Sequence, residues 1–228
     1  MLLRKILWVL LTAVTFFFVF TLDRIYLFAK AGVFQSSNAP LLKTVLLGAR
    51  FDLREVGILA AAMLLLGLIP LFNPFKSKFG RKFWLVLLSV FSVVTIFLDI
   101  ADALHFDYLL QRLNANILNF VPEGSSSTQM LWQSYPVVKL SLLLLCSCAL
   151  LVYCHVLILN TAGKSKLALP KKWGIASWAT VFLLSDLCIF GRVDQYPLRW
   201  SDAFSLGDSK MSQLALNPLP EFYQFTQF

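Results

Sequence analysis

The chain has 228 residues, of which 58% are hydrophobic and only 14% charged, and its mean hydropathy is +0.74. A water-soluble domain of this length needs more charge on its surface, so the composition excludes that class and indicates a membrane protein. The formal net charge of +8 raises the alternative of nucleic-acid binding. The basic residues lie in short segments between apolar runs, where they set orientation in a membrane, and we expect no nucleic-acid partner.

Five apolar runs are each near the length of about 20 helical residues that crosses the hydrocarbon core of a bilayer. We therefore predict an all-α membrane protein with five transmembrane helices. The predicted spans are residues 6–28, 54–75, 83–103, 138–160 and 173–191, followed by an extracytoplasmic linker over residues 192–228.

The first run also resembles a signal peptide, because Ala29-Lys30-Ala31 has the form of a cleavage site. Its apolar stretch is longer than the core of about 7–15 residues that signal peptides have. Asp23 and Arg24 also intervene before the site. We predict an anchor that is not cleaved.

The charges between the runs predict the orientation. Three segments hold ten basic residues and no acidic one; they are Arg4 and Lys5, then Lys76, Lys78, Arg81 and Lys82, then Lys164, Lys166, Lys171 and Lys172. All 12 Asp and Glu residues fall on the other side of the predicted zigzag. Because basic loops stay in the cytoplasm, we predict a cytoplasmic N-terminus and an extracytoplasmic C-terminus.

Two outer segments are predicted to be more than plain loops. The segment 41–51 is apolar but too short to span, so we expect it to lie at the membrane surface or to dip into it. Residues 102–121 alternate apolar and polar side chains in the manner of an amphipathic helix lying in the interface. Residues 122–127, with the sequence Pro-Glu-Gly-Ser-Ser-Ser, are predicted to end it as a turn.

Polar groups at the outer side are the candidates for function. Arginine side chains there can bind a lipid phosphate bidentately, or they can extend to the headgroup region and only fix the depth of a helix. Asp52 and Arg54 lie close together in the sequence and are expected to pair. Asp186 is an intramembrane carboxylate, about 9 Å along a helix from Arg192, and so a candidate by default, with an ion pair as the alternative.

No P-loop, G-x-S-x-G or H-E-x-x-H motif is present, so the sequence predicts no catalytic residue in this chain. The four cysteines lie in apolar runs, where they are expected to be small buried hydrophobic residues. We expect no metal site and no cofactor in these residues.

Three stretches carry a resemblance to a known family. The tail reads Tyr196-Pro197-Leu198-Arg199-Trp200-Ser201-Asp202-Ala203-Phe204 and then Leu214-Ala215-Leu216-Asn217-Pro218. It resembles the segment just outside the last membrane helix of the lipoteichoic acid synthase family, the sulfatase-like phosphoglycerol and phosphoethanolamine transferases. Gly48-Ala49-Arg50-Phe51-Asp52-Leu53 is similar to the family's Gly-x-Arg-Phe-Asp stretch. Asp102 with Phe106, Tyr108, Arg112 and Asn114 is similar to its outer segment after the third span.

The resemblance implies a bacterial cytoplasmic membrane and membrane lipids such as phosphatidylglycerol as partners. In that family a large extracytoplasmic domain uses a threonine nucleophile and a divalent metal, usually manganese. It transfers a phosphoglycerol-type headgroup from a phospholipid to a glycolipid or an envelope polymer. Only 37 residues, 192–228, follow the last predicted helix, fewer than the about 50 residues of a small domain.

We therefore expect the membrane-anchoring module of such a transferase, either a fragment or the product of a shortened gene, and inactive alone. Arg50, Asp52, Arg112 and Arg199 lie in the segments that resemble the family, and they are the candidate residues for binding a lipid headgroup. No catalytic or metal-binding residue of the family can be assigned to a position in this chain.

Two functions of other classes remain as alternatives. A small transporter or channel would use Asp186 and Pro70, but it needs a polar stripe through several helices. The fourth apolar run offers only Ser141, Ser147 and His155 beyond its cysteines. A non-enzymatic scaffold that binds a membrane partner is the other alternative.

Overall fold

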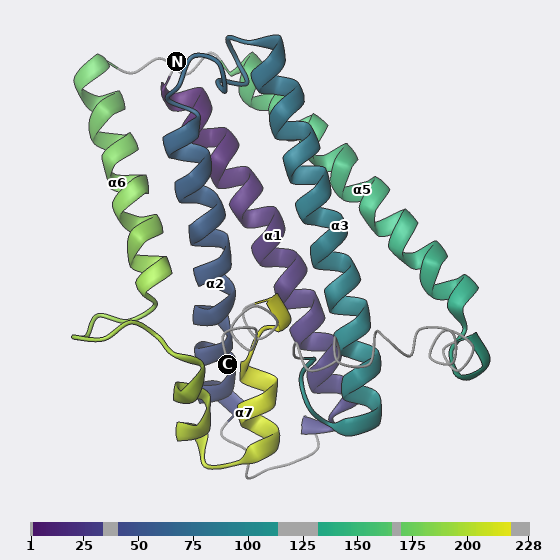
Figure 1. Cartoon of the computed structure of the whole chain (residues 1–228). Coiled ribbons are helices and arrows are strands. Elements are labelled where there is room, and N and C mark those ends of the chain that lie inside the picture. Colours follow the sequence, from purple (N-terminus) through teal and green to yellow (C-terminus); the bar gives the residue numbers. More distant parts are fainter. Residues whose placement is uncertain (1, 34–40, 114–131, 166–169, 220–228) are drawn as a thin grey trace.

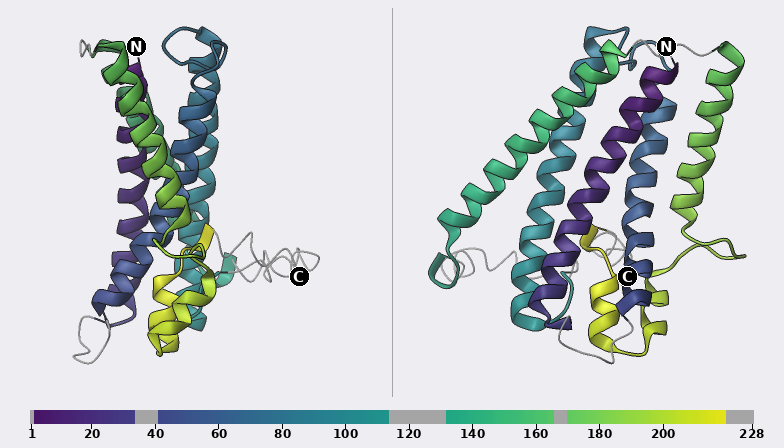
Figure 2. Two further views of the ribbon diagram at one scale, coloured as in Figure 1. Left: turned by 90° about the vertical axis from the view of Figure 1, so that its left-hand side faces the viewer. Right: turned by 180° about the vertical axis from the view of Figure 1, so that it is seen from behind.

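The computed structural model describes residues 2–33, 41–113, 132–165 and 170–219. Five long helices lie side by side: α1 (Leu2–Lys30), α2 (Leu41–Leu66), α3 (Lys78–Leu109), α5 (Val137–Lys164) and α6 (Lys171–Phe190). Helix α1 contacts the four others (Figures 1 and 2). Every regular element within the described ranges is helical, which confirms the predicted all-α class.

Four of these helices are long and apolar enough to cross a membrane, namely α1, α3, α5 and the part Lys172–Phe190 of α6. Such a set is typical of a multi-pass membrane protein. Helix α2, which contains most of the second predicted span, has 26 residues but is not in this set.

Helix α2 differs from its prediction at both ends. The segment 41–51 is not a separate surface segment, because it forms the first half of one continuous helix. Thr44, Gly48, Asp52 and Glu55 recur at spacings of three and four residues and are all buried, so both halves of α2 share one inward face. The helix then ends at Leu66 rather than near residue 75.

Turns that contain Pro70 and Pro74 follow α2, since proline lacks the N–H that would continue a helix. The Asn73 Oδ1 accepts the backbone N–H of Phe75 at 3.0 Å, and the Ser77 hydroxyl oxygen accepts that of Gly80 at 3.3 Å. These bonds reverse the chain and start α3.

Helix α3 is longer than the predicted span of residues 83–103. It continues to Leu109 and ends where Leu110 adopts a left-handed conformation with φ of 54°. Residues 102–109 are therefore its last two turns and not the start of a separate interfacial helix. Asp102 and Phe106 on these turns are buried against the bundle. The rest of the predicted interfacial helix, residues 114–121, and the predicted turn at 122–127 lie outside the described residues.

Aromatic side chains fill the core where α1, α3 and α5 meet. The rings of Trp8 and Trp84 meet edge to face with centroids 5.2 Å apart, and Phe16 meets Phe91 in the same way at 4.9 Å. Phe16 also stacks on His155 of α5 at 5.3 Å. Offset and edge-to-face geometries of this kind are the favourable ones for aromatic pairs.

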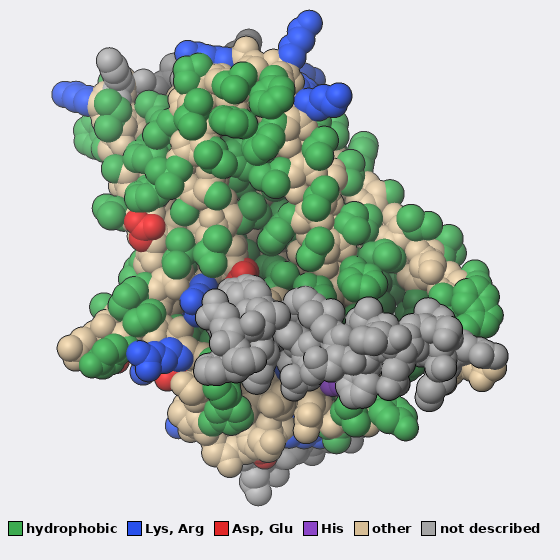
Figure 3. All heavy atoms as spheres, viewed as in Figure 1, with side chains coloured by type: hydrophobic (Ala, Val, Ile, Leu, Met, Phe, Trp, Pro, Cys, Tyr) green, Lys and Arg blue, Asp and Glu red, His purple; other side chains and the backbone are tan. Residues whose placement is uncertain are grey.

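The described residues of the three basic segments, among them Arg4, Lys5, Arg81 and Lys164, lie at one end of the bundle, at the top of Figure 3. There the Arg4 Nε donates to the Ser165 carbonyl at 3.0 Å and the Lys5 Nζ donates to the Gly67 carbonyl at 2.6 Å. Arg81 donates to the Asn160 side chain at 2.8 Å. The clustering predicted from charge along the sequence is thus present in space.

The chain after α6 packs back on the opposite end of the bundle. Gly191 ends α6 with φ of 69°, and two short elements follow: the 3₁₀ helix η3 (Trp200–Leu206) and α7 (Ser209–Ala215). Met211 and Leu214 join a buried cluster with Leu27 of α1 and Phe106 of α3. Within the predicted linker of residues 192–228, the part 198–219 therefore packs against the helices.

Candidate functional site

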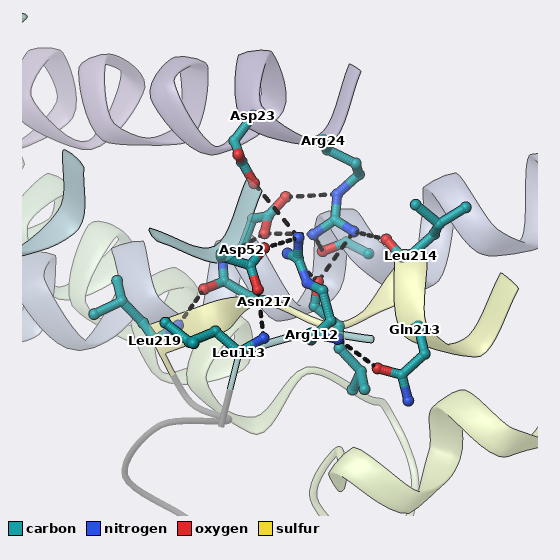
Figure 4. Close-up of polar contacts among 12 residues, drawn as sticks. Asp23, Arg24, Asp52, Arg112, Leu113, Gln213, Leu214, Asn217 and Leu219 are labelled. Carbon is teal, nitrogen blue, oxygen red and sulfur yellow. Dashed lines mark hydrogen bonds and ion pairs between the residues drawn. The ribbon is translucent and has the colours of Figure 1, made fainter. Parts of the chain in front are cut away.

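A network of buried charges joins this C-terminal segment to the ends of α1, α2 and α3 (Figure 4). Its first centre is Arg24 of α1, which is 5% exposed, and its partner Asp52 of α2, which is 1% exposed. The Arg24 Nη2 donates to the Asp52 Oδ1 at 2.6 Å, and the Arg24 Nε donates to Oδ2 at 3.1 Å. Two parallel bonds of this kind are the strongest form of an arginine–carboxylate pair.

The rest of the Arg24 guanidinium binds backbone carbonyls. Its Nη1 donates to the carbonyls of Leu214 at 2.5 Å and Ala215 at 3.0 Å, in the last turn of α7. The last carbonyls of a helix have no partner within the helix and carry partial negative charge, so a cation there is favourable. One side chain of α1 therefore holds α2 and α7 together.

Gly48 makes room for this contact. Its carbonyl accepts the Arg24 Nη2 at 3.1 Å. A Cβ on residue 48 would lie 2.5 Å from the Arg24 Cζ and 2.8 Å from its Nε, closer than carbon and nitrogen atoms can approach. The glycine is required here by the approach of a guanidinium to the backbone of α2.

Arg112, just after α3, is the second centre. It is 3% exposed, and its Nη1 donates to the Asp102 Oδ2 at 2.5 Å while its Nη2 donates to the Leu216 carbonyl at 2.7 Å. Asp23 of α1 lies 3.6 Å from the same Nη1. Burial alone would lower the pKa of the Arg112 guanidinium, but the Asp102 and Asp23 carboxylates raise it above its ordinary value. The side chain is therefore held in its charged form.

Backbone and amide bonds close the network. The Arg112 N–H donates to the Gln213 Oε1 at 2.9 Å, and the Leu113 N–H donates to the Asp102 Oδ1 at 2.6 Å. Asn217 donates to the Asp52 Oδ1 at 2.7 Å and accepts the Leu219 N–H at 3.0 Å. The segment 213–219 is thus held at successive residues by side chains of the bundle.

A more exposed set of contacts holds the chain between α6 and α7. Arg54 of α2 donates to the Leu198 carbonyl at 2.9 Å, and Arg192 pairs with Asp202 of η3 at 2.9 Å. Lys210 of α7 donates to the Ala31 carbonyl at the end of α1. These bonds place η3 and α7 at the same end of the bundle as the buried network.

The four candidate headgroup residues fall into two groups. Asp52 and Arg112 are buried in the network, where each already has several partners. Arg50 and Arg199 are exposed at the same end, and the Arg199 guanidinium lies over the Tyr196 ring at 5.5 Å. The structure therefore brings Asp52 and Arg112 together around the C-terminal segment and leaves the other two outside.

Two other sequence interpretations can be compared with the geometry. Asp52 pairs with Arg24 and not with Arg54, whose bond goes to Leu198. Asp186 is exposed on α6, with no hydrogen bond or ion pair to the described residues, and it belongs to no network.

Sequence reasoning did not single out several residues of the network. Arg24 and Asn217 were not distinguished from their neighbours, since nothing in one sequence shows that positions 24, 52 and 217 meet. Asp99 was passed over inside the third apolar run, although its place on the helix with Asp102 gave a signal. Among the described residues, the buried carboxylates of Asp52, Asp99 and Asp102 and the nearly buried one of Asp23 lie near two guanidinium groups, those of Arg24 and Arg112.

The arrangement of these side chains suits the binding of a polypeptide segment. It binds backbone carbonyls with fixed positive charges. Within the described ranges, no three His, Cys, Asp or Glu side chains lie close enough together to hold a metal ion.

Comparison with models of protein families, with curated proteins and with solved structures gives no match to this chain.

Proposed function

We propose that this protein is a membrane-anchoring module that fixes the position of the polypeptide following its last membrane helix. The observation that carries the proposal is the binding of three consecutive carbonyls, those of Leu214, Ala215 and Leu216, by Arg24 and Arg112. A segment that moved freely relative to the helices would not keep such contacts. Burying a guanidinium group is costly unless it is paired, and here the partners of Arg24 and Arg112 include the segment that is held.

The family resemblance suggests what is positioned. We propose that the fixed segment orients an extracytoplasmic, sulfatase-like domain that transfers a phosphoglycerol-type headgroup from phospholipid to a glycolipid or envelope polymer. In this proposal α2 crosses the membrane in addition to the four other long helices, which makes five spans. The N-terminus is cytoplasmic, and the membrane is the bacterial cytoplasmic membrane. Arg50 and Arg199, exposed at the end where the segment is held, are the side chains proposed to contact the phosphate of a lipid such as phosphatidylglycerol.

The test compares variants of the protein expressed from its complete gene in bacterial membranes. Membrane vesicles receive phosphatidylglycerol with a labelled headgroup, and transfer of the label to glycolipid or polymer is measured. Arg50→Ala and Arg199→Ala, at exposed sites, should lower transfer at limiting lipid without changing the amount of protein. Asn217→Ala should lower transfer at every lipid concentration, because it loosens the held segment.

Absence of any transfer by the unaltered protein would contradict the transferase proposal. The anchoring proposal is tested separately, by a spin label on Ser209→Cys in a variant without the native cysteines. An immobile label in the parent that becomes mobile in Asn217→Ala supports anchoring. Equal mobility in both would contradict it.

A further inference from the structure

One carboxylate beside the buried network has no hydrogen-bond partner among the residues that the structure describes. It is that of Asp99 on α3, which is 7% exposed and neither of whose oxygens accepts a hydrogen bond from these residues. By comparison, Asp52 accepts hydrogen bonds from Arg24 and Asn217, and Asp102 accepts them from Arg112 and the Leu113 N–H. Asp23 lies 3.6 Å from the Arg112 Nη1. An ionised carboxylate at such depth in a bilayer, without a donor, is strongly disfavoured.

The surroundings of Asp99 are already rich in negative charge. The charged groups around it are Asp23 from α1, Asp52 from α2, Asp102 from α3 itself, and Arg112 from the segment after α3. Arg24, also on α1, is committed to Asp52 and to backbone carbonyls. With every acid ionised, four carboxylates would face two guanidinium groups, and the buried cluster would carry two excess negative charges.

Asp99 also belongs to a polar stripe on α3. Ser92, Thr95, Asp99 and Asp102 follow one another at spacings of three, four and three residues and are all buried, so they share one face of α3 over about 15 Å. In the part of the chain that the structure describes, the buried hydroxyls of Thr95 and of Thr12 on α1 have no hydrogen-bond partner.

Helix α5 adds a titratable group to the inner end of this stripe. The Nε2 of His155 lies 3.0 Å from the Ser92 hydroxyl, and its Nδ1 is buried with no hydrogen-bond partner among the described residues. Chains of Asp, His and hydroxyl side chains inside membrane proteins are typical of groups that carry protons.

We propose that Asp99 is a proton-binding site, and that Thr95, Ser92 and His155 continue it toward the middle of the membrane. The bound proton removes one of the two excess negative charges and turns an unpaired carboxylate into a neutral acid. A metal ion does not fit the same place, because no three potential ligands converge among the described side chains. A proton needs one oxygen only.

The test is infrared spectroscopy of the purified full chain in lipid bilayers at neutral pH. A protonated carboxylic acid has a carbonyl-stretching band separate from that of a carboxylate. We expect this band in the parent protein and its loss in Asp99→Asn, whose amide resembles the neutral acid in shape. Asp99→Glu should keep the band at a shifted position, which provides a second readout if the Asn variant does not fold.

Two control variants separate the other carboxyl groups. Asp107→Asn should leave the band unchanged, because Asp107 is exposed and paired with Lys30 at 3.0 Å. Asp186→Asn measures how much the exposed carboxyl group of α6 contributes to the intensity of this band. A band that persists in Asp99→Asn, or that disappears in Asp23→Asn instead, would overturn the assignment to Asp99, and so would a parent spectrum with no such band.

Discussion

Asn217 donates a hydrogen bond of 2.7 Å to the Asp52 Oδ1, the oxygen that also receives the Arg24 Nη2 at 2.6 Å, although 165 residues separate the amide from the carboxylate. A single buried oxygen atom thus joins α1, α2 and the chain that follows α7. Without Asn217, the Asp52 carboxylate, which is 1% exposed, would lack one of its hydrogen-bond donors.

Replacing this amide should loosen the segment. Hydrogen bonds to charged groups contribute about 1.5–3 kcal/mol, so Asn217→Ala should lower the free energy of unfolding by that order. The measurement is unfolding of the purified protein in detergent. Gln195→Ala is the matched control, because it removes an amide that is exposed on the chain after α6, and it should leave stability unchanged.

The partner of Asp52 shows what the sequence alone could and could not predict. Residues two positions apart on a helix point in different directions, so Asp52 and Arg54 could not pair within α2. That rule excludes the local partner but does not identify Arg24, which comes from another helix. The all-α class and the presence of long apolar helices follow from local composition, whereas the ends of α2 and α3 do not.

The signal for Asp99 was present in the sequence and was not used. Ser92, Thr95, Asp99 and Asp102 have helical spacing within an apolar run, a pattern that predicts a polar stripe on one face. The length of α2 was misjudged for the opposite reason. The exposed residues Lys43 and Arg50 of α2, with Asp52 after them, suggested a surface segment. The sequence does not show that Asp52 is buried and paired with Arg24 of another helix.

Gly48 should not tolerate a side chain. A Cβ at residue 48 would push the Arg24 guanidinium away from Asp52 and from the carbonyls of α7. Overpacking of this kind costs about 1–3 kcal/mol, and part of the network would be lost in addition. Gly174→Ala on α6 is the control, since its Cβ would meet Leu2 only at 3.8 Å. The two variants should differ clearly in unfolding midpoint, and equal midpoints would contradict the role given to Gly48.

The shape of the Arg24 guanidinium should matter as well as its charge. Lysine keeps the positive charge but is a single point of donation, whereas Arg24 uses three nitrogens toward Asp52, Gly48 and the end of α7. Arg24→Lys should therefore destabilise the protein nearly as much as Arg24→Ala, by about 3–5 kcal/mol. Arg50→Lys, at an exposed site of α2, should have no effect. Full recovery of stability by the lysine variant would show that charge alone is sufficient.

Two ion pairs link the same ends of the bundle at different depths, and they should respond differently to salt. Arg112 and Asp102 are buried, whereas Lys30 and Asp107 are largely exposed. Arg112→Ala leaves Asp102 buried without a cation, which costs about 3–5 kcal/mol whatever the ionic strength. Lys30→Ala should have a much smaller effect that fades as salt is raised, because exposed charges are screened. Unfolding at low and high salt measures both, and a strong salt dependence of the Arg112 pair would contradict its burial in the membrane-bound protein.

Whether α2 crosses the membrane can be decided by labelling. Its charged residues lower its hydropathy, but Asp52 and Glu55 are buried against neighbouring elements and are not offered to lipid. A helix of 26 residues is about 39 Å long, enough to span the hydrocarbon core. In a variant without the native cysteines, Lys43→Cys should react with an impermeant thiol reagent added outside cells. Lys76→Cys, beyond the other end of α2, should react only after the membrane is opened. Labelling of both from one side would place α2 on the membrane surface and leave four spans. The N-terminus and the segment held by Arg24 would then not lie on the sides of the membrane proposed above.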